Sequence, residues 1–424
     1  MSQDPIISPK AIALAEKAGT DLLSPESKGT RKISLGLVSP PSSNPSSSSS
    51  RKTTESPEVK RSINFSSTPK ITIPTYLHSV ETYEFLGFTK SMATTLLARQ
   101  TPNRNPQDVA RDWIMDKCDQ ITDVSDDWDE AMKLAGLKDE VRTQMLKSEH
   151  QHVLYTQPLK VWLVEIIDIS YEALLDIEAN ILLQLGDEGP NLRGGAGLED
   201  QEEYTIPQMP GGHLAVYKSV DGRRAKNCIR EDGSVSLTRL ESVFETDFAR
   251  RGGLYFTHQL WVAKAYSKLI NDACAVADRR TVELHVPLSH FKEVGLWELK
   301  FGDMWKQLVY YSRRQESLPK DIQKMKADHG CIQGPISHSH TRTIVKLNSW
   351  ADIGMHHVLT SKIEDEDEDD GKQHTLIAIQ QVWISEGAIA ALEAAVFEKA
   401  YVRLPEKGFR QVLEPWEDLK HIRD

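Results

Sequence analysis

The stretch RRGGLYFTHQLWVAKAYSKL, residues 250–269, joins a glycine pair, a short apolar run and a helix-like segment without a spacer. The glycine pair lets the backbone bend, because glycine has no Cβ to restrict its dihedral angles. Leu254, Tyr255 and Phe256 follow, and apolar and aromatic residues in a short run favour a β-strand. The pattern predicts a short strand that carries Tyr255 and leads directly into a helix.

The region around this stretch, from Tyr204 onward, has the pattern of short strands separated by helical segments. Strands of about 4–7 residues with few long strand–helix–strand units favour an antiparallel sheet. The acidic run EDEDEDD at 364–370 predicts a loop between two strands, since dense like charge opposes packing. We therefore predict an α+β domain with a mainly antiparallel sheet. Its expected strands are LAVYKSV, GLYFT, TVELHVPL, HGCIQGPISH, TRTIVKL and TLIAIQQVWIS, and its expected helices include DMWKQLVYYSRRQ and EGAIAALEAAVFEKAY.

The rest of the chain divides into segments of different composition. Residues 1–70 contain a serine run and repeated Ser-Pro and Thr-Pro pairs, and so little apolar content predicts a disordered tail. The pairs fit either proline-directed phosphorylation or an ordinary linker. Apolar residues at helical spacing predict a helical domain over 71–185. A linker at 186–205, the α+β domain at 206–405 and a C-terminal extension at 406–424 complete the division.

Composition limits the possible functions. The net charge is −11, and the acidic run at 364–370 supplies seven of the negative charges. Without a basic face, nucleic-acid binding is not expected. The four cysteines are far apart in sequence, which predicts free thiols in a reducing compartment. No apolar stretch has the length of a signal peptide core or a membrane span. We expect an intracellular protein, cytoplasmic or nuclear, that does not enter a membrane.

The strand that carries Tyr255 and the helix after it resemble the second signature of the ADP-ribosyltransferase fold. In that family a Gly-[Ile/Leu]-Tyr-Phe strand opens into a Lys-Ser-x-x-Tyr helix, and this chain has Ala263, Lys264 and Tyr266 at the matching place. In the poly-ADP-ribose polymerase branch, the strand tyrosine stacks on the nicotinamide ring of NAD. The resemblance therefore implies a split, mainly antiparallel β-sheet domain in which Tyr255 contacts NAD.

Two further motifs follow the order of the same family. HLAVYKSV at 213–220 resembles the first signature strand, where the family has His-Gly or Arg-Gly after an aromatic residue and this chain has Lys218 and Ser219. IQQVWISEGAIAAL at 379–392 resembles the third signature, and Gln381 stands at the position of the catalytic Glu.

The chain is also similar to compact transferase-like domains of unassigned function, mostly bacterial. Those domains carry a Gly-Pro segment, which corresponds here to IQGPIS at 332–337, and a final motif that corresponds to QVWISEGA at 381–388. The resemblance extends over about residues 208–395 and comprises four motifs in the same order.

The resemblance implies that NAD is the substrate and that an ADP-ribosyl group is transferred to a protein acceptor. The side chains of Lys218, Tyr255 and Gln381 are then expected to converge on one cleft. The candidate catalytic residues are Lys218 and Gln381, and the candidate NAD-binding residues are Lys218, Ser219, Tyr255, Thr257 and Tyr266.

Departures from the family pattern leave two functions open. A lysine holds a phosphate only as a flexible point charge. A glutamine keeps a hydrogen bond but loses the charge that stabilises the sugar cation of the transfer reaction. The protein is therefore either an active mono-ADP-ribosyltransferase or a degenerate transferase fold that binds a nucleotide, an ADP-ribosyl group or a protein partner. For the degenerate fold, Gln381→Glu is expected to restore NAD cleavage.

Two other clusters have simpler explanations. His329, Cys331, His338 and His340 lie within twelve residues, and alternate residues of a strand share a face that could ligate a metal. A polar loop explains the same residues, and no metal site is expected. The segment 305–315 predicts a helix with an apolar inner face and a basic outer face, although its arginines could also contact a phosphate or a partner.

Overall fold

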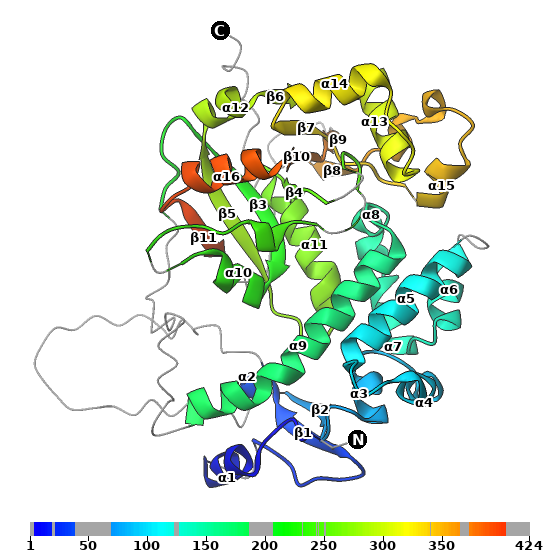
Figure 1. The fold of residues 1–424 in the computed structure, drawn as a ribbon, viewed down its shortest axis with the longest axis vertical. Coiled ribbons are helices and arrows are strands. Elements are labelled where there is room, and N and C mark those ends of the chain that lie inside the picture. The colour runs from blue at the N-terminus through cyan, green and yellow to red at the C-terminus, as the bar shows by residue number, and fades with distance from the viewer. Residues whose placement is uncertain are drawn as a thin grey trace, which may run out of the picture.

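The computed structural model describes residues 4–18, 22–38, 69–122, 127–185, 207–230, 232–242, 244, 246–249, 252–339, 341–364 and 373–403. Helices and mainly antiparallel sheets occur together, which confirms the predicted α+β class. The long helix α9 (Leu159–Leu185) crosses the molecule, with the sheets towards one end and the helices that precede it along its side (Figure 1). None of the helices in the described residues combines the length and apolar character needed to cross a bilayer.

Much of the N-terminal segment is folded. It forms α1 (Pro9–Ala18), β1 (Thr30–Ser34) and α2 (Leu35–Val38), and β1 pairs antiparallel with β2 (Lys70–Pro74). Ile33 and Leu37 are completely buried, and both α1 and α2 contact α9. This corrects the expected boundary of the tail at residue 70, because apolar side chains among the first 38 residues belong to the main core. Residues 39–68, which include the serine run, lie outside the described residues.

The predicted helical region contains six helices before α9 in its described residues. Side chains of Ser79, Thr89 and Asp127 accept hydrogen bonds from backbone amides at the start of three of them, as N-cap residues do. α5 packs along α9, and Trp162 of α9 is fully buried. The helices are α3 (Val80–Phe85), α4 (Lys90–Arg99), α5 (Pro106–Thr122), α6 (Trp128–Leu134), α7 (Asp139–Met145) and α8 (Gln151–Leu154).

The C-terminal strands form two larger sheets and one hairpin. One sheet has the order β11-β5-β3 and is antiparallel; the other has the order β4-β10-β7-β6, in which only β6 and β7 run parallel. β8 and β9 form an antiparallel hairpin whose connection includes most of the acidic run, outside the described residues. The strands are β3 (His213–Asp221), β4 (Leu254–Phe256), β5 (Arg279–Pro287), β6 (Leu296–Glu298), β7 (Cys331–Pro335), β8 (Thr360–Glu364), β9 (Gln373–Ile377), β10 (Ile379–Trp383) and β11 (Ala400–Arg403).

The structure differs from the sequence prediction at two segments. EGAIAALEAAVFEKAY was predicted as one helix, but its last two residues, Ala400 and Tyr401, belong to β11. TRTIVKL was predicted as a strand but forms α15 (Thr341–Lys346), which packs on α13 (Asp303–Arg313). Its β-branched residues favour a strand locally, but burial of Ile344 against α13 decides the structure. The other helices are α10 (Gly222–Cys228), α11 (Leu260–Ala273), α12 (Leu288–Val294), α14 (Lys320–Asp328) and α16 (Glu386–Ala395).

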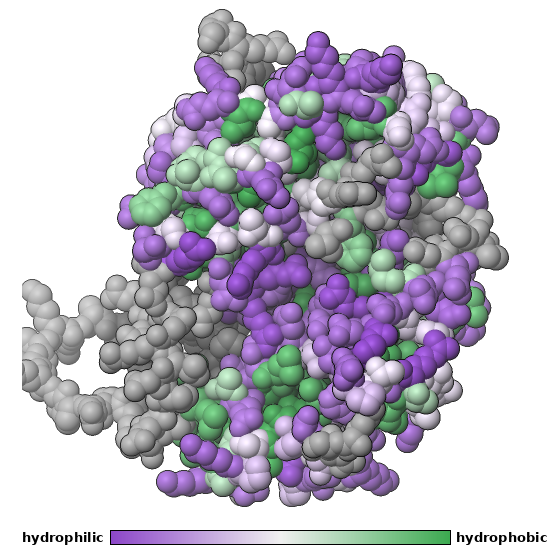
Figure 2. Space-filling model, viewed as in Figure 1, coloured by the Kyte–Doolittle hydropathy of each residue, from purple (hydrophilic) through white to green (hydrophobic). Residues whose placement is uncertain are grey.

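Helix α11 connects the helical region to the sheets. The main hydrophobic core extends from the N-terminal segment through α9 to Leu269 and Ile270 of α11, while the opposite side of α11 contacts β3. Separate cores cover the two faces of the four-stranded sheet. On the face shown in Figure 2, apolar side chains gather below the middle of the molecule, over the lower end of α9 and the N-terminal strands. Leu183 of α9 is 72% exposed.

Candidate functional site

The three strands that carry the sequence motifs lie next to one another. A single antiparallel bridge joins β3 to the end of β4, with the Tyr217 amide 2.6 Å from the Thr257 carbonyl and the Thr257 amide 2.9 Å from the Tyr217 carbonyl. β4 in turn pairs with β10. The two sheets therefore meet at this bridge, and the motif strands lie in the spatial order β3, β4, β10 (Figure 1).

The register of β4 and β10 places Tyr255 and Gln381 on opposite faces of their sheet. Gln381 is opposite Phe256, and Val382 is opposite Tyr255. Directly opposed residues share a face, and neighbours along a strand alternate, so a shift of one residue reverses the face. The expected convergence of Lys218, Tyr255 and Gln381 on one cleft is therefore wrong.

The Tyr255 side chain is part of the core. Its ring packs with Val382 in the cluster on one face of the sheet, and its hydroxyl is hydrogen-bonded to the Thr246 hydroxyl. Burial raises the pKa of the Tyr255 hydroxyl well above its usual value. A ring held in this way supports the sheet and is not presented to a ligand on the Gln381 face.

Gln381 lies at the centre of a buried polar group on the other face of the sheet. Its side chain is fully buried, and its amide nitrogen donates to Nδ1 of His258 at 2.7 Å and to Oε1 of Gln333 at 2.9 Å. Burial lowers the pKa of His258 to about 4, so the ring is neutral near pH 7 and Nδ1 acts as the acceptor. Gln381 Oε1 is buried and has no hydrogen-bond partner among the described residues.

Lys218 and Ser219 are neighbours on β3 and point to opposite faces of its sheet. Desolvation of the half-buried Lys218 ammonium lowers its pKa to about 8, although Glu165 opposes the shift. The Ser219 hydroxyl is hydrogen-bonded to Ser267 of α11 at 2.7 Å and accepts from Nε of Arg279 at 3.1 Å. Ser219 therefore helps to join β3 to α11.

Thr257 and Tyr266 also make structural contacts. The Thr257 hydroxyl accepts from the Gln259 amide at 3.1 Å, next to the bridge between the sheets. The Tyr266 hydroxyl donates to the Thr156 hydroxyl at 2.6 Å, and burial raises its pKa to about 12. The structure brings Thr257 near the Gln381 strand but directs Tyr266 towards the helical region.

A buried charged network occurs where the sequence indicated none. Nε of Arg313 lies 2.8 Å from Oδ1 of Asp247, and both residues are less than 10% exposed. The same carboxylate accepts from the amide and hydroxyl of Ser337 and from the side-chain amide of Gln380. Arg313 also donates to the carbonyl of Thr156 at 2.8 Å. The network joins the helical region to β10, and it corrects the expected outward orientation of Arg313.

The described members of the histidine and cysteine cluster, His329, Cys331 and His338, make separate contacts. Cys331 is buried in the core, His329 Nδ1 lies 2.7 Å from the Met325 carbonyl, and His338 Nε2 lies 3.0 Å from the Gln151 carbonyl. His340 lies outside the described residues.

Among the described residues, Glu149, His150 and Asp272 have ligand atoms close enough together to hold a metal. Lys268 lies 2.7 Å from Asp272 and 3.2 Å from Glu149, and Lys147 is 3.9 Å from both carboxylates. The two ammonium groups balance the two carboxylates, so the contacts describe an ion-pair cluster.

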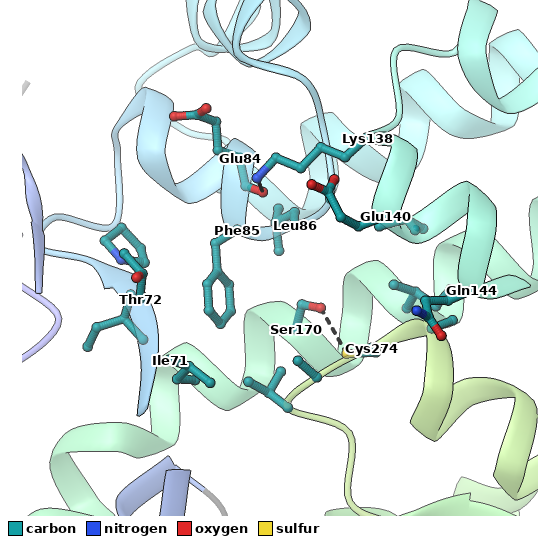
Figure 3. Close-up of a pocket in the computed structure, with 18 of the residues that line it drawn as sticks. Ile71, Thr72, Glu84, Phe85, Leu86, Lys138, Glu140, Gln144, Ser170 and Cys274 are labelled. Carbon is teal, nitrogen blue, oxygen red and sulfur yellow. Dashed lines mark hydrogen bonds between the residues drawn. The ribbon is translucent and has the colours of Figure 1, made fainter. Parts of the chain in front are cut away.

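A cavity of about 820 Å³ lies between β2, α3, α7, α9 and the end of α11. Phe85 projects into it from α3, and Ser170 and Cys274 lie together on the opposite wall, with Oγ and Sγ 3.3 Å apart (Figure 3). Burial raises the pKa of the Cys274 thiol, which keeps it protonated. None of the candidate residues from the sequence lines this cavity.

Comparison with protein families, curated protein sequences and solved structures finds no match for this chain.

Proposed function

We propose that residues 206–405 are an ADP-ribosyltransferase-like module that binds its ligand, NAD or an ADP-ribosyl group, without transferring it. The observation that carries this proposal is the environment of Gln381. The resemblance puts this residue at the catalytic carboxylate, and here it is a fully buried amide that donates to two neutral acceptors.

The chemistry of transfer makes that environment decisive. Departure of nicotinamide leaves positive charge on the ribose, and a fixed negative group lowers the energy of that state most effectively in a water-excluded site. Gln381, His258 and Gln333 supply no negative charge. Tyr255 lies on the opposite face of the sheet, so the aromatic contact and the amide do not act on one ligand.

Binding is supported by the acceptor that remains. Gln381 Oε1 is a buried oxygen without a partner among the described residues, and leaving such an atom unpaired costs about 1–3 kcal/mol. A carboxamide N–H, as in nicotinamide, is a donor that suits this oxygen. A ligand with that group would gain this hydrogen bond when the site opens to admit it, because the Gln381 side chain is completely buried in this structure.

The first test is retention of labelled NAD by the full chain, measured together with release of nicotinamide and covalent label. We expect retention without either product. Gln381→Leu removes the acceptor and should weaken retention roughly tenfold, the equivalent of about 1.4 kcal/mol. Tyr255→Phe removes only a hydroxyl on the other face and should leave retention unchanged. Transfer by the wild type would establish the active enzyme instead, and absence of retention would refute NAD as the ligand.

The second test is Gln381→Glu, which the sequence alone predicts to restore cleavage. We now expect no gain in nicotinamide release and a loss of about 1–3 kcal/mol in the free energy of unfolding. An ionised glutamate cannot donate to His258 or Gln333, and its charge would be buried. Urea denaturation measures the stability change. Glu386→Gln, at an exposed carboxylate in the first turn of α16, should cost less than about 1 kcal/mol. Cleavage that appears in a fully stable Gln381→Glu variant would contradict the proposal.

A further inference from the structure

The 820 Å³ cavity presents the edge of a β-strand. Four consecutive residues of β2, 71–74, line it (Figure 3 labels the first two). Side chains of a strand alternate between its two faces, so a strand that turned one face to a cavity would contribute every second residue. An uninterrupted run of lining residues indicates that the backbone itself borders the space.

The backbone groups of Thr72 point towards that space. On the far side of β1, the Lys32 carbonyl accepts from the Ser24 amide at 2.8 Å, so Lys32 directs its polar groups away from β2. Bonded and non-bonded pairs alternate along an antiparallel ladder. Thr72, which is opposite Lys32, therefore makes no backbone hydrogen bond to β1. Its neighbours Ile71 and Ile73 do make backbone hydrogen bonds to β1. On its outer side the amide and carbonyl of Thr72 have no backbone partner within the described ranges.

The remaining lining residues include both apolar and acidic side chains. Phe85, Leu86 and Ile166 line the interior. Glu140 is exposed, and its side chain lies on the same side of the pocket as Lys138 (Figure 3). Lys138 also lines the cavity, but its ammonium donates to the Glu84 carbonyl at 2.7 Å. The acidic lining residues are Glu81, Glu84, Glu140 and Asp272, of which Asp272 pairs with Lys268 outside the lining, and Lys138 is the single basic residue among the described lining residues.

We propose that this cleft binds an extended peptide segment of a partner protein, which adds as a strand to the edge of β2 and places a basic side chain beside Glu140. A free strand edge offers a donor and an acceptor in the spacing of another strand, so main-chain bonds supply affinity. Alternate side chains of the peptide enter the apolar interior and supply specificity. Gln381 does not line the cleft, and this inference is independent of the NAD proposal.

The binding test uses the full chain and fluorescent octapeptides of alternating valine and threonine, measured by fluorescence anisotropy. One set carries a central lysine and a matched set carries glutamate. A third set is the lysine peptide with N-methyl groups on alternate amides, which blocks strand pairing. We expect the lysine peptide to bind at least tenfold more tightly than either of the others.

Two variants at Thr72 distinguish the contribution of its main-chain N–H to binding from that of its side chain. Thr72→Pro removes the outward N–H while leaving the bonds to β1, and proline is tolerated where the N–H of an edge strand faces outward. It should weaken binding of the lysine peptide at least tenfold, whereas Thr72→Ala should leave binding within about twofold of wild type. Ala275→Trp places a large side chain at an exposed lining residue on the opposite wall and should also abolish binding. This variant replaces Thr72→Pro in the test if the proline variant does not fold.

The role of the Glu140 carboxylate is tested by Glu140→Lys, which should reverse the preference between the lysine and glutamate peptides. The control is Glu130→Lys on α6, which changes the same charge outside the cavity lining. Equal binding to wild type and Thr72→Pro would overturn the proposal, as would the absence of binding by every peptide at about 1 mM. Self-association of the chain that Thr72→Pro abolishes would identify a second copy as the occupant and overturn the proposed partner.

Discussion

Replacing Asp247 with alanine is expected to lower the free energy of unfolding by about 3–5 kcal/mol, measured by urea denaturation. The carboxylate is 3% exposed and accepts four hydrogen bonds, from Arg313, Gln380 and twice from Ser337. Its removal leaves the Arg313 guanidinium buried without its counter-ion. Removing one partner of a buried ion pair destabilises a protein far more than the intact pair stabilises it, because the remaining charge stays buried and unpaired.

The neighbouring residue supplies the matched control. Arg314 follows Arg313, but it is only half-buried and pairs with Glu316 at 2.7 Å. Arg314→Ala should cost less than about 1 kcal/mol, because partly exposed ion pairs contribute little. The double variant Asp247→Ala/Arg313→Leu should be less destabilised than the sum of the single variants, since the unpaired charge is gone. A loss at Asp247 no larger than that at Arg314 would show that the network does not hold the two regions together.

Local structure in the C-terminal region was largely predictable from the sequence. The strand at 254–256, the helix after it and the strands that contain Lys218 and Gln381 all form where the pattern places them. These elements depend on residue type and spacing within a short window, which a single sequence contains. The antiparallel pairing of β4 with β10 agrees with the predicted class of sheet.

The convergence of the candidate site was not predictable, because it depends on register. Tyr255 and Gln381 lie on paired strands, and a shift of one residue in their pairing decides whether they share a face. Gln380, one position earlier, lies on the Tyr255 face and bonds to Asp247. The strands that carry the three motifs are neighbours in the structure, but a motif order does not assign their side chains to faces.

The buried ion pair of Arg313 and Asp247 could not be predicted from the sequence for a related reason. Arg313 and Asp247 are 66 residues apart in the chain, and an arginine near the end of an amphipathic helix has the pattern of a solvated residue. Only tertiary contact shows that the two side chains pair. The same limitation applies to the edge of β2, whose open side depends on which residues of β1 bond to it.

Deleting residues 1–38 is expected to lower the melting temperature by roughly 10 °C or more, in contrast to the small effect that composition predicts. At about 2–4 °C per kcal/mol for a large domain, this corresponds to a loss of about 3–5 kcal/mol. The low apolar content of the first 70 residues as a whole conceals short clusters that are buried. Ile33 and Leu37 are completely buried, and their loss would expose the side of α9 that α1 and α2 cover.

Two comparisons isolate that cause. Replacement of residues 40–67 by a short Gly-Ser linker should leave the melting temperature unchanged, because the Leu35 amide bonds to the Pro69 carbonyl at 2.8 Å and so holds the start of α2 beside the residue that precedes β2. Within β1, Ile33→Ala should cost about 2–5 kcal/mol, as truncation of a core side chain does. Lys32→Ala, one residue earlier on the exposed face, should change stability by less than about 0.5 kcal/mol.

The three outcomes together distinguish packing from a general effect of shortening the chain. If deletion of 1–38 and the linker replacement lower the melting temperature equally, the contacts of α1, β1 and α2 do not support α9. If only the deletion and Ile33→Ala are destabilising, the N-terminal segment is a structural part of the fold. In that case the edge of β2 exists only because β1 holds the opposite side of the strand, so the deletion should also abolish binding of the lysine peptide.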